Sequence, residues 1–388
     1  MAERPAPLVL VVDPGAAPDP DLPFGSYAAV GEAGRRKLAI ELSRRLGSLG
    51  VVVAPLHPAR PSRGESFHWG RWFTAAARGA LERIHAAGRP LDAIGYAGAG
   101  ALALADDELL SALVSPIPGE AVGNNRYSTD AFVVAGAADG RLDMEAALTS
   151  LASCSTDNAA IRCLEAAGFA VRDLSSEGWA RFDVDTPLDL ALLRIATRLP
   201  GTRRPDGLVT AFLEMAVLPG GRGLELPGLE RVGAVLRDRE AQLVVAGRIP
   251  SSAWVYLETQ TACRVRCFIE ERGMRSARDA VPHSFLADWT ERLGPADLVT
   301  ELASLGDAVI LDSRVLMASR GGSADATAWP PVEERFASDF LDATPVATPW
   351  LAELTEAAAA SSVPFLLGGH ALVSDGLRIL VDAAWLGR

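Results

Sequence analysis

The sequence predicts an α/β protein of two domains, each a mostly parallel sheet flanked by helices. Short apolar runs rich in β-branched residues alternate with segments of helical periodicity along the chain. This alternation, with short links, is typical of strands joined by helical crossovers. Prolines, glycines and charges gather at residues 200–207 and predict a linker at residues 201–207, so the domains are expected at residues 1–200 and 208–388.

In the first half, apolar runs predict strands at residues 7–12, 51–54, 91–96, 120–122, 131–135 and 169–174. Apolar residues three or four positions apart predict helices at residues 35–49, 73–87, 154–167 and 188–198. A further short strand is expected to begin at Trp179 and to end at Asp183 and Asp185, whose alternation would point them to opposite faces.

In the second half, strands are expected at residues 241–247, 262–270, 307–314 and 363–370, and helices at residues 229–238, 251–259, 350–361 and 377–385. Polar residues gather where these strands end, namely Arg248, Glu270, Glu271, Arg272, Asp312, Arg314 and His370. Because the carboxyl ends of parallel strands line the ligand crevice of an open sheet, they predict a second polar site. A histidine after two glycines is also typical of a plain turn.

The composition argues against several classes of protein. With 49% hydrophobic and 22% charged residues, the 388-residue chain can bury a core and is not expected to be disordered. A net charge of -12 argues against broad binding to nucleic acid or anionic membranes, and no apolar run reaches membrane-spanning length. The four cysteines form no Cys-x-x-Cys pair and match no zinc spacing, so we expect reduced thiols in a cytoplasmic protein.

One run combines carboxylates with a helix start: Asp183-Val-Asp185-Thr-Pro187-Leu-Asp189-Leu. Thr186 is placed to cap a helix that opens at Pro187, where a proline costs no hydrogen bond. Asp189 lies in the first turn and suits the positive end of the helix dipole. From local physics alone, the run is equally well an ordinary acidic turn between a strand and a helix.

The run resembles the C-terminal signature of nucleotidyltransferase-like proteins, which include phospholactate guanylyltransferases and the guanylyl- and cytidylyltransferases of the molybdopterin cofactor. The resemblance would extend over residues 6–200 and implies a Rossmann-related fold whose signature follows the last core strand, near a divalent metal. It implies Asp183 and Asp185 as catalytic residues and as ligands of a magnesium ion. Asp106 is a further candidate ligand, although it also suits the start of a helix.

The resemblance also implies a phosphate-binding loop after the first strand, because helix N-terminal amides point outward there. In this chain three glycines fall between residues 25 and 34, and Arg35, Arg36 and Lys37 follow as candidate phosphate contacts, but their order differs from the family motif. Lys37 is the only lysine of the chain, which suggests a charge that arginine could not replace. Ala101 stands where the family has a metal-holding aspartate.

A second polar stretch lies between the strands expected at residues 120–122 and 131–135. It contributes Asn124, Asn125, Arg126, Ser128 and Asp130 as candidate nucleotide-binding residues. Asparagine can bond a base edge or a sugar hydroxyl, and arginine can bind a phosphate through two hydrogen bonds. The alternative is a tight asparagine-rich turn with an Asx cap.

The leading expectation is a magnesium-dependent enzyme that transfers a nucleoside monophosphate from a nucleoside triphosphate to a small phosphorylated or acidic acceptor. The intact run from Asp183 to Asp189 favours this function. The altered first loop and Ala101 favour a non-catalytic protein that keeps the fold and binds a nucleotide or a sugar. A third alternative places an independent activity in the C-terminal domain. We expect neither nucleic acid nor a membrane among the partners.

Overall fold

The computed structural model describes residues 6–13, 25–57, 67–137, 143–271, 283–323 and 325–386. It confirms the α/β class, with 50% helix and 17% strand. Contacts group the described residues into two compact units. The first comprises residues 6–13, 32–57, 67–137, 143–184 and 205–209, and the second comprises residues 25–31, 185–204, 210–271, 283–323 and 325–386. The linker predicted at residues 201–207 lies across one of these divisions and stays a prediction.

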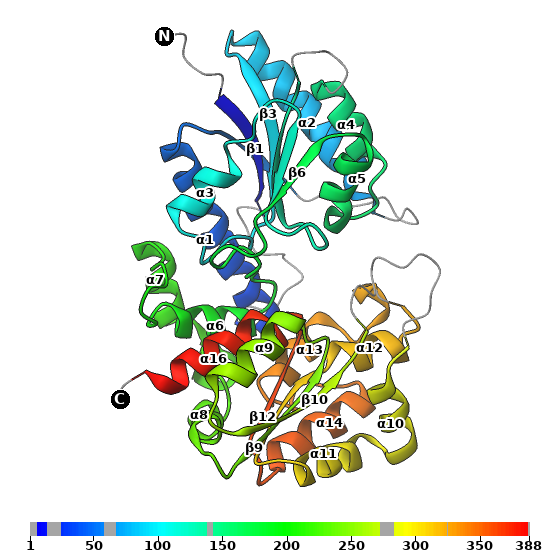
Figure 1. Ribbon diagram of the computed structural model, residues 1–388. Coiled ribbons are helices and arrows are strands. Elements are labelled where there is room, and N and C mark those ends of the chain that lie inside the picture. The colour runs from blue at the N-terminus through cyan, green and yellow to red at the C-terminus, as the bar shows by residue number, and fades with distance from the viewer. Residues whose placement is uncertain are drawn as a thin grey trace. The chain divides into compact units, whose positions relative to one another are not determined.

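The first unit contains a six-stranded sheet, of which Figure 1 labels β1, β3 and β6. Its strand order is β2-β1-β3-β5-β4-β6. Neighbouring strands are parallel except for β5, which is antiparallel to both β3 and β4. All six strands lie where apolar runs predict them: β1 (Ala6–Val12), β2 (Val52–Leu56), β3 (Leu91–Ala97), β4 (Glu120–Gly123), β5 (Ala131–Ala135) and β6 (Ala170–Asp173).

Helices cover both faces of this sheet. They are α2 (Trp69–Ala86), α3 (Asp107–Leu113), α4 (Met144–Ala152) and α5 (Ala160–Ala166), with a 3-10 turn at Asp157–Ala159. Alternate residues of β1 enter different core clusters, because successive strand side chains point to opposite faces. Val9 and Val11 join residues of α1 (Tyr27–Ser48) and α3, whereas Leu8 and Leu10 join residues of α2, α4 and α5.

The second unit contains a four-stranded, wholly parallel sheet in the order β10-β9-β11-β12. Its strands are β9 (Gln242–Gly247), β10 (Arg264–Ile269), β11 (Ala308–Asp312) and β12 (Phe365–Gly368). A separate two-stranded ribbon pairs β7 (Val217–Leu218) with β8 (Arg222–Gly223), joined by the 3-10 turn Pro219–Gly221. Every residue of β11 and β12 is buried, as continuous apolar runs in a parallel sheet predict.

Helices also flank the second sheet. They are α6 (Pro187–Ala196), α8 (Leu229–Arg237), α9 (Ser251–Gln260), α10 (Phe285–Leu293), α11 (Pro295–Ser304), α12 (Arg314–Arg320), α13 (Val332–Asp339), α14 (Pro349–Ala360), α15 (His370–Val373) and α16 (Asp375–Trp385), with a 3-10 turn at Ala326–Ala328. The closing helix α16 packs against α6, α8 and α9, and α11 packs against α14. Helix α7 (Gly207–Met215), like α1, contains residues of both units.

The structure corrects three predictions of local structure. Helix α1 begins at Tyr27 and not at residue 35. The helix expected at residues 154–167 is a 3-10 turn followed by the shorter α5. The strand expected to end at Asp185 is not formed, because residues 178–181 make a turn and residues 182–185 have no regular structure. The apolar Phe182 and Val184 are nevertheless buried, which explains their strand-like pattern.

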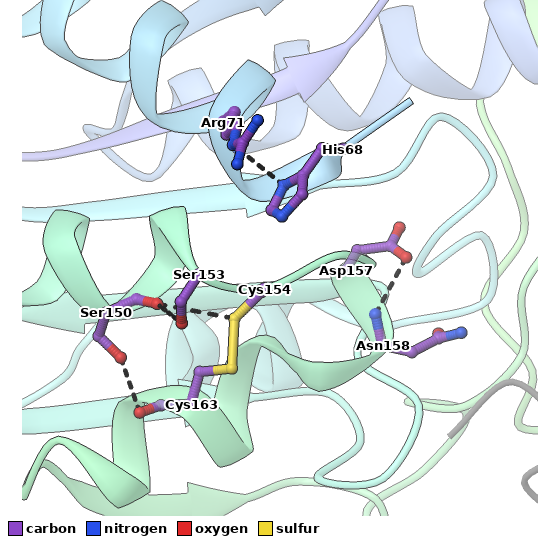
Figure 2. The surroundings of a disulfide bond; sticks show 8 residues. All are labelled: His68, Arg71, Ser150, Ser153, Cys154, Asp157, Asn158 and Cys163. Atoms are coloured by element: carbon purple, nitrogen blue, oxygen red, sulfur yellow. Dashed lines mark hydrogen bonds between the residues drawn. A yellow bond between two sulfur atoms is a disulfide. The ribbon is translucent and has the colours of Figure 1, made fainter. Parts of the chain in front are cut away.

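A disulfide bond joins Cys154, after α4, to Cys163 of α5 (Figure 2). The expectation of reduced thiols is therefore wrong for this pair, whose spacing of nine residues gives no sequence signal, and it holds for Cys263 and Cys267. Ser150 supports the same corner by donating a hydrogen bond from its hydroxyl to the carbonyl oxygen of Cys163 at 2.7 Å. Among the described residues, no helix is both long and apolar enough to cross a bilayer.

Candidate functional site

Thr186, Pro187 and Asp189 of the signature run form the start of helix α6, as the sequence predicts. Thr186 is the N-cap and Pro187 occupies the first helical turn. The Thr186 hydroxyl oxygen accepts a hydrogen bond from the N–H of Asp189 at 3.2 Å. In return, Oδ2 of Asp189 accepts from the N–H groups of Asp185 and Thr186 at 3.0 and 2.9 Å. This reciprocal capping box satisfies amides that the first turn of a helix leaves without partners.

The capping carboxyl of Asp189 is almost completely buried. Asp189 is 3% exposed. Burial is the main cause that raises the pKa of its carboxyl to about 7, and repulsion from Asp185 adds to the shift. Hydrogen bonds from Asp185 and Thr186 oppose this shift. A carboxyl that is used in this way supports the start of α6, so we assign Asp189 a structural role.

Asp183 lies beside the turn that follows β3. Its Oδ1 accepts a hydrogen bond from the N–H of Val184 at 2.9 Å, and that N–H also points to the carbonyl oxygen of Gly100 at 3.2 Å. A Cβ atom on Gly100 would lie 2.0 Å from the Val184 carbonyl oxygen and 2.9 Å from Oδ1 of Asp183. The two segments that the resemblance places near a metal, residues 100–101 and 183–184, are therefore neighbours in the first unit.

Strained backbone follows this contact. Leu102 has φ of 61° although it is a buried leucine with 2% of its surface exposed. A bulky residue in the left-handed region costs energy that the surrounding structure must offset, and such strain is common at functional turns. Leu102 is a feature of this turn that the sequence does not signal.

The residues present do not fit the magnesium site that the resemblance implies. Ala101 has no ligand atom and is 2% exposed. Asp106 is the N-cap of α3, and its Oδ1 accepts from the N–H of Leu109 at 2.8 Å, as the helix-start alternative predicts. No group of three or more histidine, cysteine, aspartate or glutamate residues within the described ranges could hold a metal ion.

The candidate phosphate contacts lie inside a helix and not in a loop. Because α1 begins at Tyr27, Arg35, Arg36 and Lys37 fall in its third turn, and Arg35 is about 12 Å along the axis from Tyr27. Their own amides belong to the helix ladder, so only their side chains could reach a ligand. Arg36 forms an ion pair with Glu32 at 3.6 Å. The side chain of Lys37 makes no ion pair or hydrogen bond with any residue that the structure describes.

The N-terminus of α1, where a phosphate would be expected, is filled by a carboxylate of the chain itself. Oε1 and Oε2 of Glu333 accept hydrogen bonds from the N–H groups of Tyr27 and Ala28 at 2.9 and 2.8 Å. The next two amides, of Ala29 and Val30, bond to the side chain and the carbonyl oxygen of Ser26 at 3.2 and 3.1 Å. The first four amides of α1 are thus all satisfied, three of them by side chains.

Asn124, predicted to bind nucleotide, is buried and fully bonded inside the first unit. It is 1% exposed. Its Oδ1 accepts from the N–H groups of Asp130 and Ala131 at 2.9 and 3.0 Å. Its Nδ2 donates to Oδ2 of Asp130 at 3.3 Å and to the carbonyl oxygen of Ala180 at 3.1 Å. An asparagine uses its whole hydrogen-bonding capacity in such an arrangement.

The neighbouring candidates of the same loop also bond within the unit. Asn125 accepts from the N–H of Tyr127 at 3.1 Å, which makes an Asx turn. Arg126 pairs with Glu165 at 2.5 Å, and the Ser128 hydroxyl donates to Asn158 at 3.1 Å. The structure therefore brings the loop residues together, but most of their hydrogen bonds hold the loop itself.

No model of a known protein family matches the sequence, and no curated protein matches it either. Sequence reasoning missed Glu333, which lies 306 positions from Tyr27, so no local pattern could connect the two. A glutamate in the first turn of a helix is ordinary, and only the folded chain shows that it caps a second helix.

Proposed function

We propose that this chain is a nucleotidyltransferase-like protein that binds a nucleotide or sugar through its hydroxyl groups and does not carry out magnesium-dependent nucleotidyl transfer. The observation that carries the proposal is the pair of hydrogen bonds from Tyr27 and Ala28 to Glu333. A carboxylate already satisfies the positive end of α1, and a phosphate would have to displace it.

The signature run supports the nucleotidyltransferase-like part of the proposal. It follows β6, which is the last strand of the six-stranded sheet in chain order, as the resemblance implies. Its Val184 also contacts Gly100 in the turn where the family carries its metal-holding aspartate. The position of that aspartate is occupied by Ala101, which supports the loss of transfer chemistry.

Carboxylates at one edge of the first sheet support recognition through hydroxyl groups. Asp13 follows β1, and Asp130 precedes the antiparallel β5, so both lie at the carboxyl edge of the parallel strands. The carbonyl oxygen of Asp130 accepts from the N–H of Gly98, directly after β3, at 2.8 Å. Asp183 lies near the same turn. Half-buried carboxylates accept hydrogen bonds from ribose or sugar hydroxyls, whereas they repel phosphates.

The competing function is the magnesium-dependent transferase, which the intact Asp183-x-Asp185-Thr-Pro run favours. The two functions differ in what the phosphates contribute. In a transferase the metal bridges the phosphates, so triphosphate binding requires magnesium. In a protein that binds its ligand through hydroxyl groups, the phosphates add nothing to the affinity.

Thermal unfolding of the full chain separates the two functions. The ligands are the four ribonucleosides, their triphosphates, UDP-glucose and GDP-mannose, each with and without magnesium. We expect a nucleoside or nucleotide sugar to raise the melting temperature equally in both conditions, because a ligand of the folded state stabilises it by mass action. The triphosphate should do no better than its nucleoside.

The variant Asp183→Asn and the control Asp143→Asn complete the experiment. Asp143 caps α4, and asparagine caps a helix as well as aspartate does, so the control loses the same charge without losing its cap. A shift that needs both triphosphate and magnesium, and that only Asp183→Asn abolishes, would establish the transferase instead. The absence of a shift with every ligand would contradict binding altogether.

A further inference from the structure

The topology of the second sheet marks one position at its carboxyl edge. From β9 the chain passes to β10 on one side, and then to β11 on the other side of β9. Between β9 and β11 the winding reverses, and open parallel sheets bind ligands in the crevice outside such a switch point. Arg248 directly follows β9, and Asp312 ends β11, so two of the polar strand ends predicted from the sequence are neighbours at this point.

Arg248 and Asp312 form a two-point ion pair there. Nε and Nη2 of Arg248 donate to Oδ2 and Oδ1 of Asp312 at 2.6 and 3.0 Å. The side chain of Asp312 is 0% exposed, whereas 18% of the Arg248 side chain is exposed. Oδ1 of Asp312 also accepts from the N–H of Arg314 at 3.2 Å. Burial acts to raise the pKa of Asp312, but the nearby Arg248 lowers it below its usual value, so the carboxyl is charged.

The backbone is built to allow this close approach. Gly247 has φ of 134°, a conformation that side-chain-bearing residues rarely adopt. A Cβ atom there would lie 2.3 Å from the Cβ of Asp312. The glycine thus lets the end of β9 lie against Asp312, and it places the following arginine beside the carboxylate.

Other charged groups at this edge are used by the fold. Arg314 donates to both carboxylate oxygens of Asp339 at 2.8 and 2.5 Å, and both residues are buried. Glu270, after β10, accepts hydrogen bonds from the hydroxyl of Ser284 and the N–H of Leu286 at the start of α10. Arg248 differs, because its Nη1 has no partner among the described residues and is not enclosed.

A contribution to folding stability does not explain why the chain has this ion pair. A buried ion pair contributes little compared with apolar residues of the same shape, because both charges lose their water. A guanidinium held along one edge, however, presents its remaining N–H donors in a fixed direction at no further cost in side-chain entropy. Guanidinium groups match the geometry of carboxylates and phosphates.

We infer that the carboxyl edge of the second sheet, at the ends of β9 and β11, binds a small molecule through a carboxylate or phosphate group that contacts Arg248. Asp312 is the positioning residue, since it fixes the direction of the guanidinium. This site lies in the second unit and is independent of the function proposed for the first. Of the polar strand ends that the sequence predicts in the second half, Arg248 would thus bind an anionic ligand.

Calorimetric titration of the full chain with inorganic phosphate, and separately with malonate, at constant ionic strength tests this site. We expect saturable binding of at least one probe, and the preferred probe distinguishes a phosphate ligand from a carboxylate ligand. Arg248→Lys keeps a charge beside Asp312 but loses the planar fork that directs N–H donors outward, so its affinity should fall about tenfold. Arg198→Lys is the matched control, because Arg198 is an exposed arginine of the same unit that pairs with Glu214.

The double variant Arg248→Met with Asp312→Asn removes both charges together and avoids a buried charge without a partner. It should stay folded and bind neither probe. Wild-type protein that binds neither probe would overturn the inference. So would an Arg248→Lys variant, or a folded double variant, that binds as tightly as the wild type.

Discussion

The peptide unit of Val184 lies directly against Gly100. The N–H of Val184 donates to the Gly100 carbonyl oxygen at 3.2 Å, and its own carbonyl oxygen lies 2.0 Å from the place where a side chain at position 100 would begin. This contact joins the turn after β3 to the signature run over a separation of more than eighty positions. It explains why the turn needs a residue without a side chain there.

Gly100→Ala should therefore destabilise the protein strongly. The new methyl group would meet backbone, which cannot move aside as a flexible side chain could, so we expect a loss of about 1–3 kcal/mol or more in the free energy of unfolding. Urea unfolding measures the loss. Gly98→Ala is the control in the same turn, because its nearest atoms would lie at 3.5 and 3.7 Å, which is ordinary contact. Equal stability of the two variants would show that the segments do not touch as described.

Asn124 gives a second test, which separates a structural role from ligand binding. Asn124→Ala leaves the N–H groups of Asp130 and Ala131 without their acceptor in a buried position. Each buried group left unpaired costs about 1–3 kcal/mol, so urea unfolding should show a loss of at least about 2 kcal/mol. Asn125→Ala, which removes one hydrogen bond in an exposed turn, should cost less than about 1 kcal/mol. A stable Asn124→Ala variant with weakened ligand binding would restore Asn124 to the binding residues.

Local patterns predicted the strands well, because a buried strand needs only a short apolar run between turn residues. The start of α6 was also predictable, since Thr186, Pro187 and Asp189 act on one another within a single turn. The start of α1 was not. Glycines at 31 and 34 suggested a loop, but the first amides of the helix are satisfied by Ser26 and the distant Glu333, which hold the helix from Tyr27 onward.

The candidate site was predictable only in part for the same reason. The apolar runs of the sequence predicted Arg248 and Asp312 at the ends of two strands. Those strands, β9 and β11, pair in parallel, which makes the two residues neighbours. Spacing could not show that Asn124 spends all its hydrogen bonds inside the first unit, because one of its partners, Ala180, lies 56 positions away. Residue type indicates which hydrogen bonds are possible, whereas the fold determines which partners are present.

Asp189 predicts a pH dependence of stability whose sign is fixed by burial. Its pKa is raised to about 7 in the folded chain, whereas an unfolded aspartate titrates near 3.9. Between about pH 4 and pH 7 the folded state therefore holds a proton that the unfolded state has lost. The free energy of unfolding should fall as the pH rises through this range, by up to about 1.4 kcal/mol per pH unit. The contribution is fully present below pH 4 and is lost above pH 7.

Asp189→Asn isolates this contribution from other titrating groups. Asparagine keeps an oxygen that can accept from the N–H groups of Asp185 and Thr186, but it cannot ionise. Urea unfolding of both proteins between pH 4.5 and pH 7.5 gives the difference in free energy of unfolding, wild type minus variant, at each pH. We expect this difference to decrease steadily as the pH rises, because only the wild type must bury a new charge. A difference that stays constant would mean that Asp189 is ionised in both states throughout the range, as a carboxylate beside a cationic partner would be.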